Sequence, residues 1–374
     1  MSDIEKVLIT GGAGFIGSHL ADALLAKGYR VRVLDNLSEQ VHGAGREFPS
    51  YLDREIEALE GDIRNPSDVE RAVSDVDAVF HFASAVGVGQ SMYEIERYVD
   101  VNNRGTAVLL EALRRRPLAK LIVASSMSIY GEGSYRDGNG ALCAPRPRSL
   151  QQLKSGEWNL AGPDGAPLVP CPTPEDKTPM PESIYALSKY DQEMMCLLVG
   201  RAYGIPVVAL RFFNVYGERQ ALSNPYTGVL AVFAARYLNE RPPVIFEDGC
   251  QKRDFVHVRD LAAGCVLALE NSSVRDEVFN LGGGAAYSIL EIAERLGEIL
   301  GKRYLSAQVT GSYRSGDIRN CFADISKAGR VLGYRPQITL EAGLTAFAQW
   351  LEGRLDEDRS EIAARELRRH GLVA

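Results

Sequence analysis

The sequence is poor in the features that mark several classes of protein. It has no run of basic residues longer than three and a formal net charge of −7, which argues against a nucleic-acid-binding surface. It also lacks a hydrophobic run of membrane-spanning length and a segment with the pattern of a secretory signal. Its six cysteines are scattered without paired spacing, so we expect reduced thiols and no disulfide framework. These absences predict a cytoplasmic protein that binds neither nucleic acid nor membrane.

What is present indicates a two-lobed α/β protein. A chain of 374 residues that is 45% hydrophobic can bury a large core and tends to divide into two domains. Short apolar segments alternate with amphipathic ones, which is typical of βαβ units in a doubly wound, Rossmann-like parallel sheet. The expected strands are residues 7–10, 31–34, 57–61, 78–83, 121–125, 207–212 and 278–281, and the expected helices are residues 18–27, 66–74, 101–115, 183–203 and 258–270.

The order of these segments predicts the domain boundaries. We assign residues 1–217, completed by about 256–282, to the doubly wound domain, and residues 218–255 and 283–374 to a smaller α/β lobe. Within residues 352–369 the charge is dense, and we expect a solvated terminal helix.

One segment, about residues 132–182, breaks the alternation of strands and helices. Nine of the 17 prolines lie between Pro145 and Pro181, and the segment shows no strand or helix of any length. We therefore expect an inserted loop that acts as a lid or moves. Cys143 and Cys171 are two candidate metal ligands, but the segment has no histidine and no Cys-x-x-Cys motif, so we expect no metal site.

A glycine-rich turn near the N-terminus predicts a dinucleotide site. Gly11, Gly14 and Gly17 follow an apolar run and open a helical pattern, with a G-x-x-G-x-x-G spacing. Such glycines allow a tight turn, a close approach to a pyrophosphate, and close packing of the helix on the strand. The amides at the helix start, including those of Phe15 and Ile16, then face the phosphates.

Asp35 follows the second expected strand, where an acidic residue hydrogen-bonds the adenosine ribose in such sites. Its charge would repel a 2′-phosphate, so we expect NAD and not NADP as the cofactor. The alternative is a doubly wound domain whose first turn binds nothing or another phosphate ligand.

Tyr185 and Lys189 are four residues apart in an expected helix and so project from one face. A tyrosine of ordinary pKa, about 10, is a poor base at neutral pH, but a neighbouring cation favours the phenolate, which can accept a proton from a substrate hydroxyl. The alternative is a surface pair. Ser126 and Ser128 lie at the end of strand 121–125, and ligands of open parallel sheets bind at that edge, which favours the catalytic interpretation.

Taken together, these motifs resemble the extended short-chain dehydrogenase/reductases, and among them the NAD-dependent nucleotide-sugar 4-epimerases. The resemblance covers nearly the whole chain. It implies an isomerase with NAD as cofactor, a nucleotide-diphosphate sugar as substrate, and a homodimer formed through helices 101–115 and 183–203. The matching segments are residues 10–17, 35–37, 61–63, 81–83, 102–106, 125–131, 185–189, 211–217, 253–260 and 314–317.

The resemblance also implies residue roles. Ser126, Tyr185 and Lys189 form the catalytic set, with Tyr185 as base and then acid and Lys189 on the nicotinamide ribose. Besides the glycine turn, Asp35, Tyr185 and Lys189, the implied NAD-binding residues are Asn36, Asp62, Ile63, Phe82, Ala83, Ser84 and Asn102. The implied substrate-binding residues, placed in the smaller lobe or beside the catalytic set, are Val86, Ser126, Ser128, Asn214, Arg253, Arg314 and Asp317.

The residues after Ser126 narrow the reaction. Dehydratases of the superfamily carry two acids there, whereas this chain has Met127 and Ser128. This favours inversion at C4 through a transient 4-keto sugar. A 4-ketoreductase or dehydrogenase with the same catalytic residues stays open as an alternative, and a 4,6-dehydratase is the less favoured one. A non-catalytic NAD-binding protein would be expected to lose Tyr185 or Lys189.

The sequence says less about the identity of the substrate than about the type of reaction. Val86 stands where UDP-galactose 4-epimerase-like proteins carry a lysine, and the run of residues 87–94 and the long insertion look closer to dTDP-L-rhamnose 4-epimerase-like proteins. We therefore expect a dTDP- or UDP-linked hexose, with a deoxysugar such as L-rhamnose as a candidate. No motif that we can interpret identifies the base.

Overall fold

A seven-stranded parallel sheet forms the centre of the molecule in the computed structural model, which describes residues 4–116, 118–143, 145–222, 224, 226, 228–314, 316–353 and 358–373. All seven predicted strands are confirmed. In spatial order they are β14 (Glu277–Leu281), β9 (Val207–Phe212), β5 (Lys120–Ser126), β4 (Ala78–His81), β1 (Lys6–Thr10), β2 (Arg30–Asp35) and β3 (Glu57–Glu60). The central strands are continuous apolar runs because helices cover both faces of the sheet.

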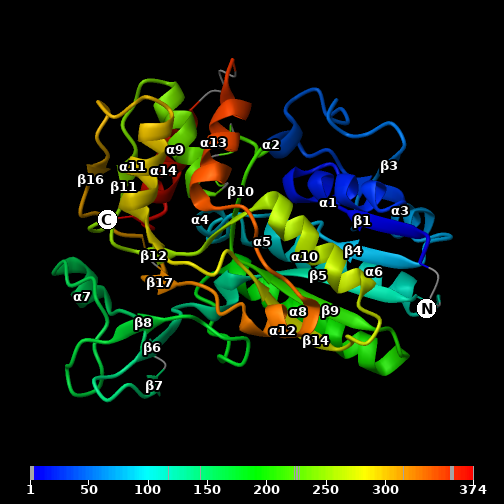
Figure 1. Cartoon of the computed structure of the whole chain (residues 1–374), viewed down its shortest axis with the longest axis horizontal. Coiled ribbons are helices and arrows are strands. Elements are labelled where there is room, and N and C mark those ends of the chain that lie inside the picture. Colours follow the sequence, from blue (N-terminus) through cyan, green and yellow to red (C-terminus); the bar gives the residue numbers. More distant parts are fainter. Residues whose placement is uncertain are drawn as a thin grey trace.

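Helices cover both faces of the sheet (Figure 1), and each face has its own hydrophobic core. On one face α1 (Phe15–Ala26) and α10 (Val258–Glu270) supply Leu20, Leu24 and Leu261. The same core includes Ala328 and Leu332 of α12 (Ser326–Leu332), which packs beside β14. The other face is covered by α3 (Pro66–Ala72), α6 (Gly105–Leu113) and α8 (Ile184–Tyr203). This is the doubly wound, Rossmann-like arrangement that the sequence predicts.

A third core joins parts of the chain that are far apart in sequence. It contains Leu230, Phe233, Ile292, Leu344 and Phe347. These side chains come from α9 (Val229–Leu238), α11 (Ile289–Ile299) and α13 (Leu340–Leu351). Short strand pairs surround them: β10 (Asn214–Tyr216) with β13 (Phe255–His257), β11 (Val244–Ile245) with β16 (Gln308–Val309), and β15 (Tyr287–Ser288) with β12 (Lys252–Arg253) and β17 (Asn320–Cys321). We call these elements, together with the loops that join β11 to β12 and β16 to β17, the small lobe.

The inserted segment is not the irregular loop that the sequence predicts. It forms a three-stranded antiparallel sheet in the spatial order β7 (Leu142–Cys143), β6 (Ser134–Arg136) and β8 (Val169–Cys171). The short helix α7 (Leu150–Lys154) lies between β7 and β8 in the sequence. Tyr135, Leu160 and Leu168 make a small core of its own. The prediction failed because strands of two or three residues are too short to display a period of two. Figure 1 shows this segment and the small lobe on one side of the molecule, with β1 to β3 on the other.

The helix expected at residues 101–115 also differs from its prediction. It begins earlier, as α5 (Ile95–Tyr98), continues as a π-helix over Val99–Arg104, and becomes α-helical only in α6. A π-helical turn inserted into an α-helix is rare and is frequently found at functional sites.

The C-terminal segment is packed against the protein, which corrects the expectation of a solvated helix. In α14 (Ser360–Arg369) both Ala363 and Leu367 are buried. Leu367 packs against Gly89 in α4 (Val88–Ser91), and Val373 forms an antiparallel bridge with Arg314. Among the described residues, no helix is long and apolar enough to cross a membrane.

Candidate active site

The glycine-rich turn between β1 and α1 is packed too closely to hold side chains at two of its glycines. Gly11 has a φ of +71°, and a Cβ atom there would lie 2.9 Å from the backbone nitrogen of Ala83. At Gly17 a Cβ atom would lie 2.4 Å from the carbonyl oxygen of Gly11, so any side chain would push α1 away from the turn. Helix α1 starts after Gly14 without a side-chain cap, and its first amides have no partner within the helix. The turn therefore offers a cradle for a phosphate group.

Asp35 is fixed beside this cradle at the end of β2. Its buried carboxylate accepts hydrogen bonds from the backbone nitrogens of Ala13 (3.1 Å) and Leu37 (3.0 Å). Nε2 of His42, in α2 (Glu39–His42), lies 3.5 Å from the same carboxylate. A negative charge is thus held where the ribose of a dinucleotide would lie, and it disfavours a 2′-phosphate there.

A polar cavity of about 420 Å³ lies beyond the ends of β2 and β3. In its wall, the carboxylate of Asp62 accepts hydrogen bonds from Arg64 (2.7 Å) and from Asn36 (3.1 Å). The hydrogen bonds from Arg64 lower the pKa of Asp62 to about 2. Ile63 is buried against Gly105. The residues that line the cavity are Asn36, Ser38, Glu39, Arg46, Glu60, Gly61, Asp62 and Arg64.

Two of the predicted catalytic hydroxyls meet where β5 ends and α8 begins. Ser126 ends β5 and is followed by a 3₁₀ turn over Met127–Tyr130. Its Oγ accepts hydrogen bonds from the backbone nitrogen (3.2 Å) and the hydroxyl (2.9 Å) of Ser128. Tyr185 forms a side-chain hydrogen bond with Ser126. Burial raises the pKa of Tyr185, and this hydrogen bond opposes the rise.

The start of α8 is fixed from two sides. Ser183 is the N-cap, and its Oγ accepts a hydrogen bond from the backbone nitrogen of Ala186 (3.1 Å). Oγ of Ser91, at the end of α4, accepts one from the backbone nitrogen of Tyr185 (2.9 Å). The helix therefore presents Tyr185 to the end of β5 in one orientation.

Lys189 lies one helical turn after Tyr185 and is almost completely buried. Its Nζ donates a hydrogen bond to Oε1 of Gln192 (2.7 Å). Burial lowers the pKa of Lys189 to about 7. Gln192 in turn donates to Oγ1 of Thr106 (2.8 Å).

A buried chain of hydrogen bonds continues from Thr106 to the glycine turn through His81. Thr106 donates to the carbonyl oxygen of Asn102 (2.5 Å), so its hydroxyl oxygen accepts the hydrogen bond from Nε2–H of His81 (2.9 Å). Nδ1 of His81 then accepts a hydrogen bond from Oγ1 of Thr10 (2.9 Å). These partners fix the neutral imidazole with its proton on Nε2. Burial lowers the pKa of His81 to about 3, in agreement with a neutral ring.

Asn102 braces the loop after β4 against α8. Its Oδ1 accepts hydrogen bonds from Oγ of Ser84 (3.0 Å) and the backbone nitrogen of Ala85 (2.7 Å). Its Nδ2 donates to Oγ of Ser188, the neighbour of Lys189 (2.8 Å). Asn102 belongs to the π-helical turn, which gives that irregular turn a role in placing the site. Phe82 and Ala83 were also predicted to line the dinucleotide path, and their backbone nitrogens donate hydrogen bonds to Oγ1 of Thr10.

A second cluster of predicted site residues lies in the small lobe. Arg314 stacks on the ring of Phe246 at 4.8 Å and pairs with Asp317 at 3.2 Å. Arg253 lies 3.7 Å from Asp317 and donates to the backbone carbonyls of Ile318 and Arg319. Burial acts to raise the pKa of Asp317, but the charges of Arg314, Arg253 and Arg148 lower it overall.

The remaining predicted substrate residues lie around the catalytic set. Asn214 donates from Nδ2 to the carbonyl oxygen of Asp254 (3.0 Å) and lies 3.5 Å from the sulfur of Met127, next to Ser126. Val86 is exposed in the loop after β4. The structure therefore groups Ser126, Ser128 and Tyr185 at one sheet edge and Arg253, Arg314 and Asp317 in the small lobe.

Several residues of the site were not predicted from the sequence as site residues, and Gln192, His81 and Ser91 are examples. Gln192 lies three positions after Lys189 on the same helix face, so its spacing was a usable signal. His81 was noted only as part of a matching segment. Ser91 had no signal, because it meets Tyr185 across 94 positions of the chain.

The residues present fit a dinucleotide such as NAD. The cradle at Gly11 and Gly17 has no room for side chains of its own. The turn and the first amides of α1 match the phosphates of the adenosine half. The carboxylate of Asp35 matches its ribose, and the polar cavity around Asp62 matches its base.

Comparisons with known proteins agree with this geometry. The profile of the "NAD dependent epimerase/dehydratase family" matches residues 7–151 and 155–282. The chain is 33% identical to a dTDP-L-rhamnose 4-epimerase of Burkholderia thailandensis, over 95% of this chain and 97% of that protein. It is 30% identical to a UDP-glucose 4-epimerase of Bacillus subtilis, over 95% and 99%. A crystal structure of UDP-glucuronic acid 4-epimerase from Bacillus cereus with UDP-glucuronic acid and NAD superposes with a TM-score of 0.75, at 32% identity, covering 93% of this chain and 99% of that chain.

Proposed function

The chain belongs to the NAD dependent epimerase/dehydratase family, and from this premise we propose that it inverts C4 of a dTDP- or UDP-linked hexose, with 6-deoxyhexoses such as L-rhamnose as the first candidates. It is an NAD-dependent nucleotide-sugar 4-epimerase, and hence an isomerase, as are its relatives. The choice of sugar and base is the proposed part. It is supported by the alignment with the dTDP-L-rhamnose enzyme over nearly the whole of both chains.

The catalytic steps follow from the residues at the end of β5. NAD, when bound, supplies a hydride acceptor that can return the same hydride. Ser126 holds the C4 hydroxyl of the sugar, and Tyr185 removes its proton while the hydrogen on C4 leaves as hydride, which gives a 4-keto sugar. After the sugar has turned over, the hydride returns to the opposite face of C4 and Tyr185 returns the proton to the C4 oxygen. Lys189 is on the same helix face, where its charge favours the phenolate form of Tyr185.

The observation that carries the proposal is that no carboxylic acid follows Ser126 in the 3₁₀ turn beside Tyr185. Met127 and Ser128 follow Ser126 in the 3₁₀ turn, and neither can transfer a proton to or from a sugar carbon at neutral pH. Removal of water therefore lacks its acid and base at this position. The chemistry that remains needs only one hydroxyl proton and one hydride.

The remaining half of the substrate is assigned to the small lobe. We propose that Arg253 and Arg314 bind the diphosphate, because guanidinium groups make planar, charge-assisted hydrogen bonds to phosphate oxygens. Asp317 pairs with both side chains and so limits their orientations. Binding energy placed on this remote group leaves the hexose free to rotate in the site.

We also propose a homodimer through α8 and the helix formed by α5, the π-helical turn and α6. Leu187 and Leu198 of α8 and Val99 of the π-helical turn are exposed apolar side chains on these helices. A second copy would cover them. Light scattering of the purified protein should give twice the 40.9 kDa chain mass, and a mass of one chain would contradict the dimer.

The test of the function is a substrate panel followed by NMR. The purified protein is incubated, with no added cofactor, with UDP-, dTDP- and GDP-hexoses, including dTDP-L-rhamnose. We expect one pyrimidine nucleotide sugar to form an equilibrium mixture with its C4 epimer. Turnover only with added NAD(H) would favour the 4-ketoreductase instead, loss of water would favour the dehydratase, and preference for a GDP-sugar would contradict the proposed base.

A further inference from the structure

The inserted segment meets the small lobe through a buried cluster of charged side chains. The cluster contains Arg148 and Asn159 from the insertion, and Glu247, Asp248 and Arg319 from the small lobe. Side chains of Arg148, Glu247 and Arg319 are at most 3% exposed. None of these residues belongs to the catalytic set, and the proposed reaction gives them no role.

Arg148 reaches furthest from the insertion into the small lobe. Its Nη1 donates to Oε1 of Glu247 (2.8 Å), and its Nη2 donates to the backbone carbonyl of Asp317 (2.8 Å). Asp317 is the residue that pairs with both Arg253 and Arg314. One guanidinium from the insertion therefore touches the backbone of the residue between the two proposed diphosphate ligands.

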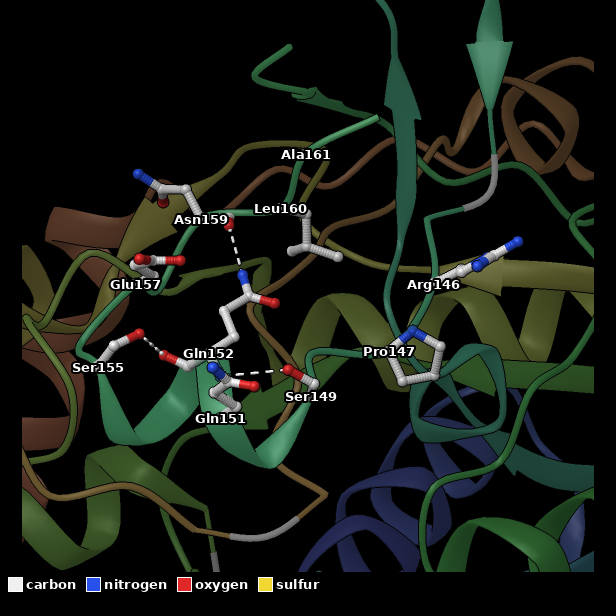
Figure 2. A pocket seen from close by; sticks show the side chains of 10 residues that line it. All are labelled: Arg146, Pro147, Ser149, Gln151, Gln152, Ser155, Glu157, Asn159, Leu160 and Ala161. Atoms are coloured by element: carbon white, nitrogen blue, oxygen red, sulfur yellow. Dashed lines mark hydrogen bonds between the residues drawn. The ribbon is translucent and has the colours of Figure 1, made fainter. Parts of the chain in front are cut away.

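Arg319 makes the second set of contacts. It forms a bidentate pair with Asp248 (2.6 and 2.8 Å), bonds Glu247 at 3.0 Å, and donates to Oδ1 of Asn159 at 3.0 Å. The backbone carbonyl of Asn159 in turn accepts a hydrogen bond from Gln152 of α7 (2.9 Å). Figure 2 shows this bond, which closes one side of a cavity of about 510 Å³ beside α7. The whole α7 region is thus tied to the small lobe.

Glu132, at the entrance to the insertion, holds the same stretch of backbone. Its carboxylate accepts hydrogen bonds from the backbone nitrogens of Arg319 (2.6 Å) and Asn320 (3.1 Å). On the opposite side, Arg253 donates to the carbonyls of Ile318 and Arg319. Residues 317–320 therefore lie between insertion side chains and a proposed diphosphate ligand.

Glu247 connects the cluster to Arg314 by a second route. It accepts hydrogen bonds from both Arg148 and Arg319, and it directly follows Phe246 in the chain. The ring of Phe246 carries the guanidinium of Arg314. A shift of Glu247 would move this ring, so both proposed diphosphate ligands depend on the cluster for their position.

We propose that the insertion is a buttress for the diphosphate subsite, and that Arg148 is the positioning residue through which it orients Arg253 and Arg314. The proposal rests on the proposed function for the identity of the ligand. Desolvating ion pairs costs more than packing apolar side chains in the same place, so such a cluster is a poor device for stability alone. Holding two guanidinium groups at the spacing of a diphosphate is a task that suits it, since small misplacements of binding groups cost large factors in rate or affinity.

The test compares Arg148→Met and Arg148→Lys with the control Arg136→Met. Arg136 is exposed on β6 of the same insertion and donates to the carbonyl of Gly140 (2.8 Å), so the control loses the same charge without touching the small lobe. Calorimetry on the NAD-containing protein measures binding of dTDP and UDP against dTMP and UMP. Hydrogen exchange measures the backbone amides of residues 318–320.

We expect Arg148→Met to raise the Kd for dTDP or UDP about tenfold. The Kd for dTMP or UMP should rise less than about threefold, because the variant disturbs only the residues that bind the second phosphate. The amides of residues 318–320 should exchange faster. Arg148→Lys should lie between this variant and the wild type, and Arg136→Met should match the wild type.

Equal loss of mono- and diphosphate binding, unchanged exchange, or the same effect in Arg136→Met would overturn the proposal. Should Arg148→Met not fold, Arg148→Lys decides, and wild-type binding and exchange in that variant would contradict the buttress. A wild type that binds neither dTDP nor UDP would refute the proposed nucleotide, while the exchange measurement would still decide whether Arg148 holds the backbone.

Discussion

Tyr185 and Lys189 are both pushed toward their neutral forms by their surroundings. Burial raises the pKa of Tyr185 and lowers that of Lys189 to about 7. A phenolate at Tyr185 therefore needs a compensating positive charge close by, and we propose that Lys189, one turn along the helix, supplies it. The hydrogen bond with Ser126 lowers the pKa of Tyr185 and so favours the same form.

Replacement of Tyr185 tests this pairing. Tyr185→Phe should lower kcat by about a thousandfold, since it removes a general acid–base group. The variant should keep its NAD, because the glycine turn, Asp35 and the polar cavity around Asp62 are unchanged. Steady-state rates and the NAD content of the purified variant measure both effects. Tyr190→Phe, further along α8, is the control, and a rate loss as large in that variant would contradict the assignment.

His81 should make the folded protein sensitive to acid. Its pKa falls from about 6.5 in the unfolded chain to about 3 in the folded one, chiefly because of burial. Between these values the unfolded chain binds a proton that the folded one does not, so stability decreases as the pH falls from 6.5 toward 3. The slope contributed approaches about 1.4 kcal/mol per pH unit.

Urea unfolding between pH 4 and 6.5 measures this slope. His81→Gln should show a smaller dependence on pH than the wild type by up to that amount, whatever its stability at pH 7. Identical slopes would mean that His81 is charged in the folded protein, which the hydrogen bonds of Thr10 and Thr106 do not accommodate.

Gly17 should not tolerate even a methyl group. Its Cβ would lie 2.4 Å from the carbonyl oxygen of Gly11, so Gly17→Ala should cost about 2 kcal/mol of stability and reduce the NAD content. At Gly14 the nearest atom would lie at 3.4 Å, and Gly14→Ala should cost less than about 1 kcal/mol. Denaturant midpoints of the two variants measure the difference, and equal costs would contradict the packing described for the turn.

At the scale of elements, the predictions from sequence succeeded where an element was long and buried. The inner strands β1, β5 and β9 are largely apolar and bounded by turn signals, so they can be recognised without knowledge of their neighbours. Strands β2 and β3 carry charged residues among the apolar ones. The strands β6, β7 and β8 are two or three residues long, so alternation is not visible in them. The π-helical turn at Val99–Arg104 was missed because a local change of helix period leaves the pattern of apolar residues nearly intact.

The docking of α14 leads to a prediction about that helix alone. Leu367→Ala removes buried contacts with Gly89 and should weaken the docking of the C-terminal segment by about 2 to 3 kcal/mol. Trypsin should then cut faster at Arg365, Arg368 and Arg369. Ile362→Ala, at an exposed position of the same helix, is the control. Equal cleavage rates in wild type and Leu367→Ala would show that the helix is held by other contacts.

At the scale of the whole molecule, the site is assembled from segments that no local pattern connects. Lys189 reaches the glycine turn through Gln192, Thr106 and His81, and Gln192 is 86 positions from Thr106. Arg148 meets Glu247 across 99 positions. The sequence could identify the ends of such chains by their motifs, but the middle residues are ordinary side chains that acquire a role only when the fold brings them together.

The central claim is that one hydride leaves C4 of a nucleotide sugar and returns to the other face of the same carbon. The most direct measurement uses the substrate found in the panel, labelled with deuterium at C4, with the protein as purified and no added cofactor. NMR of the product in ordinary water should show the C4 epimer with the deuterium still at C4. Replacement of that deuterium by hydrogen, or a requirement for added NAD(H), would contradict the account.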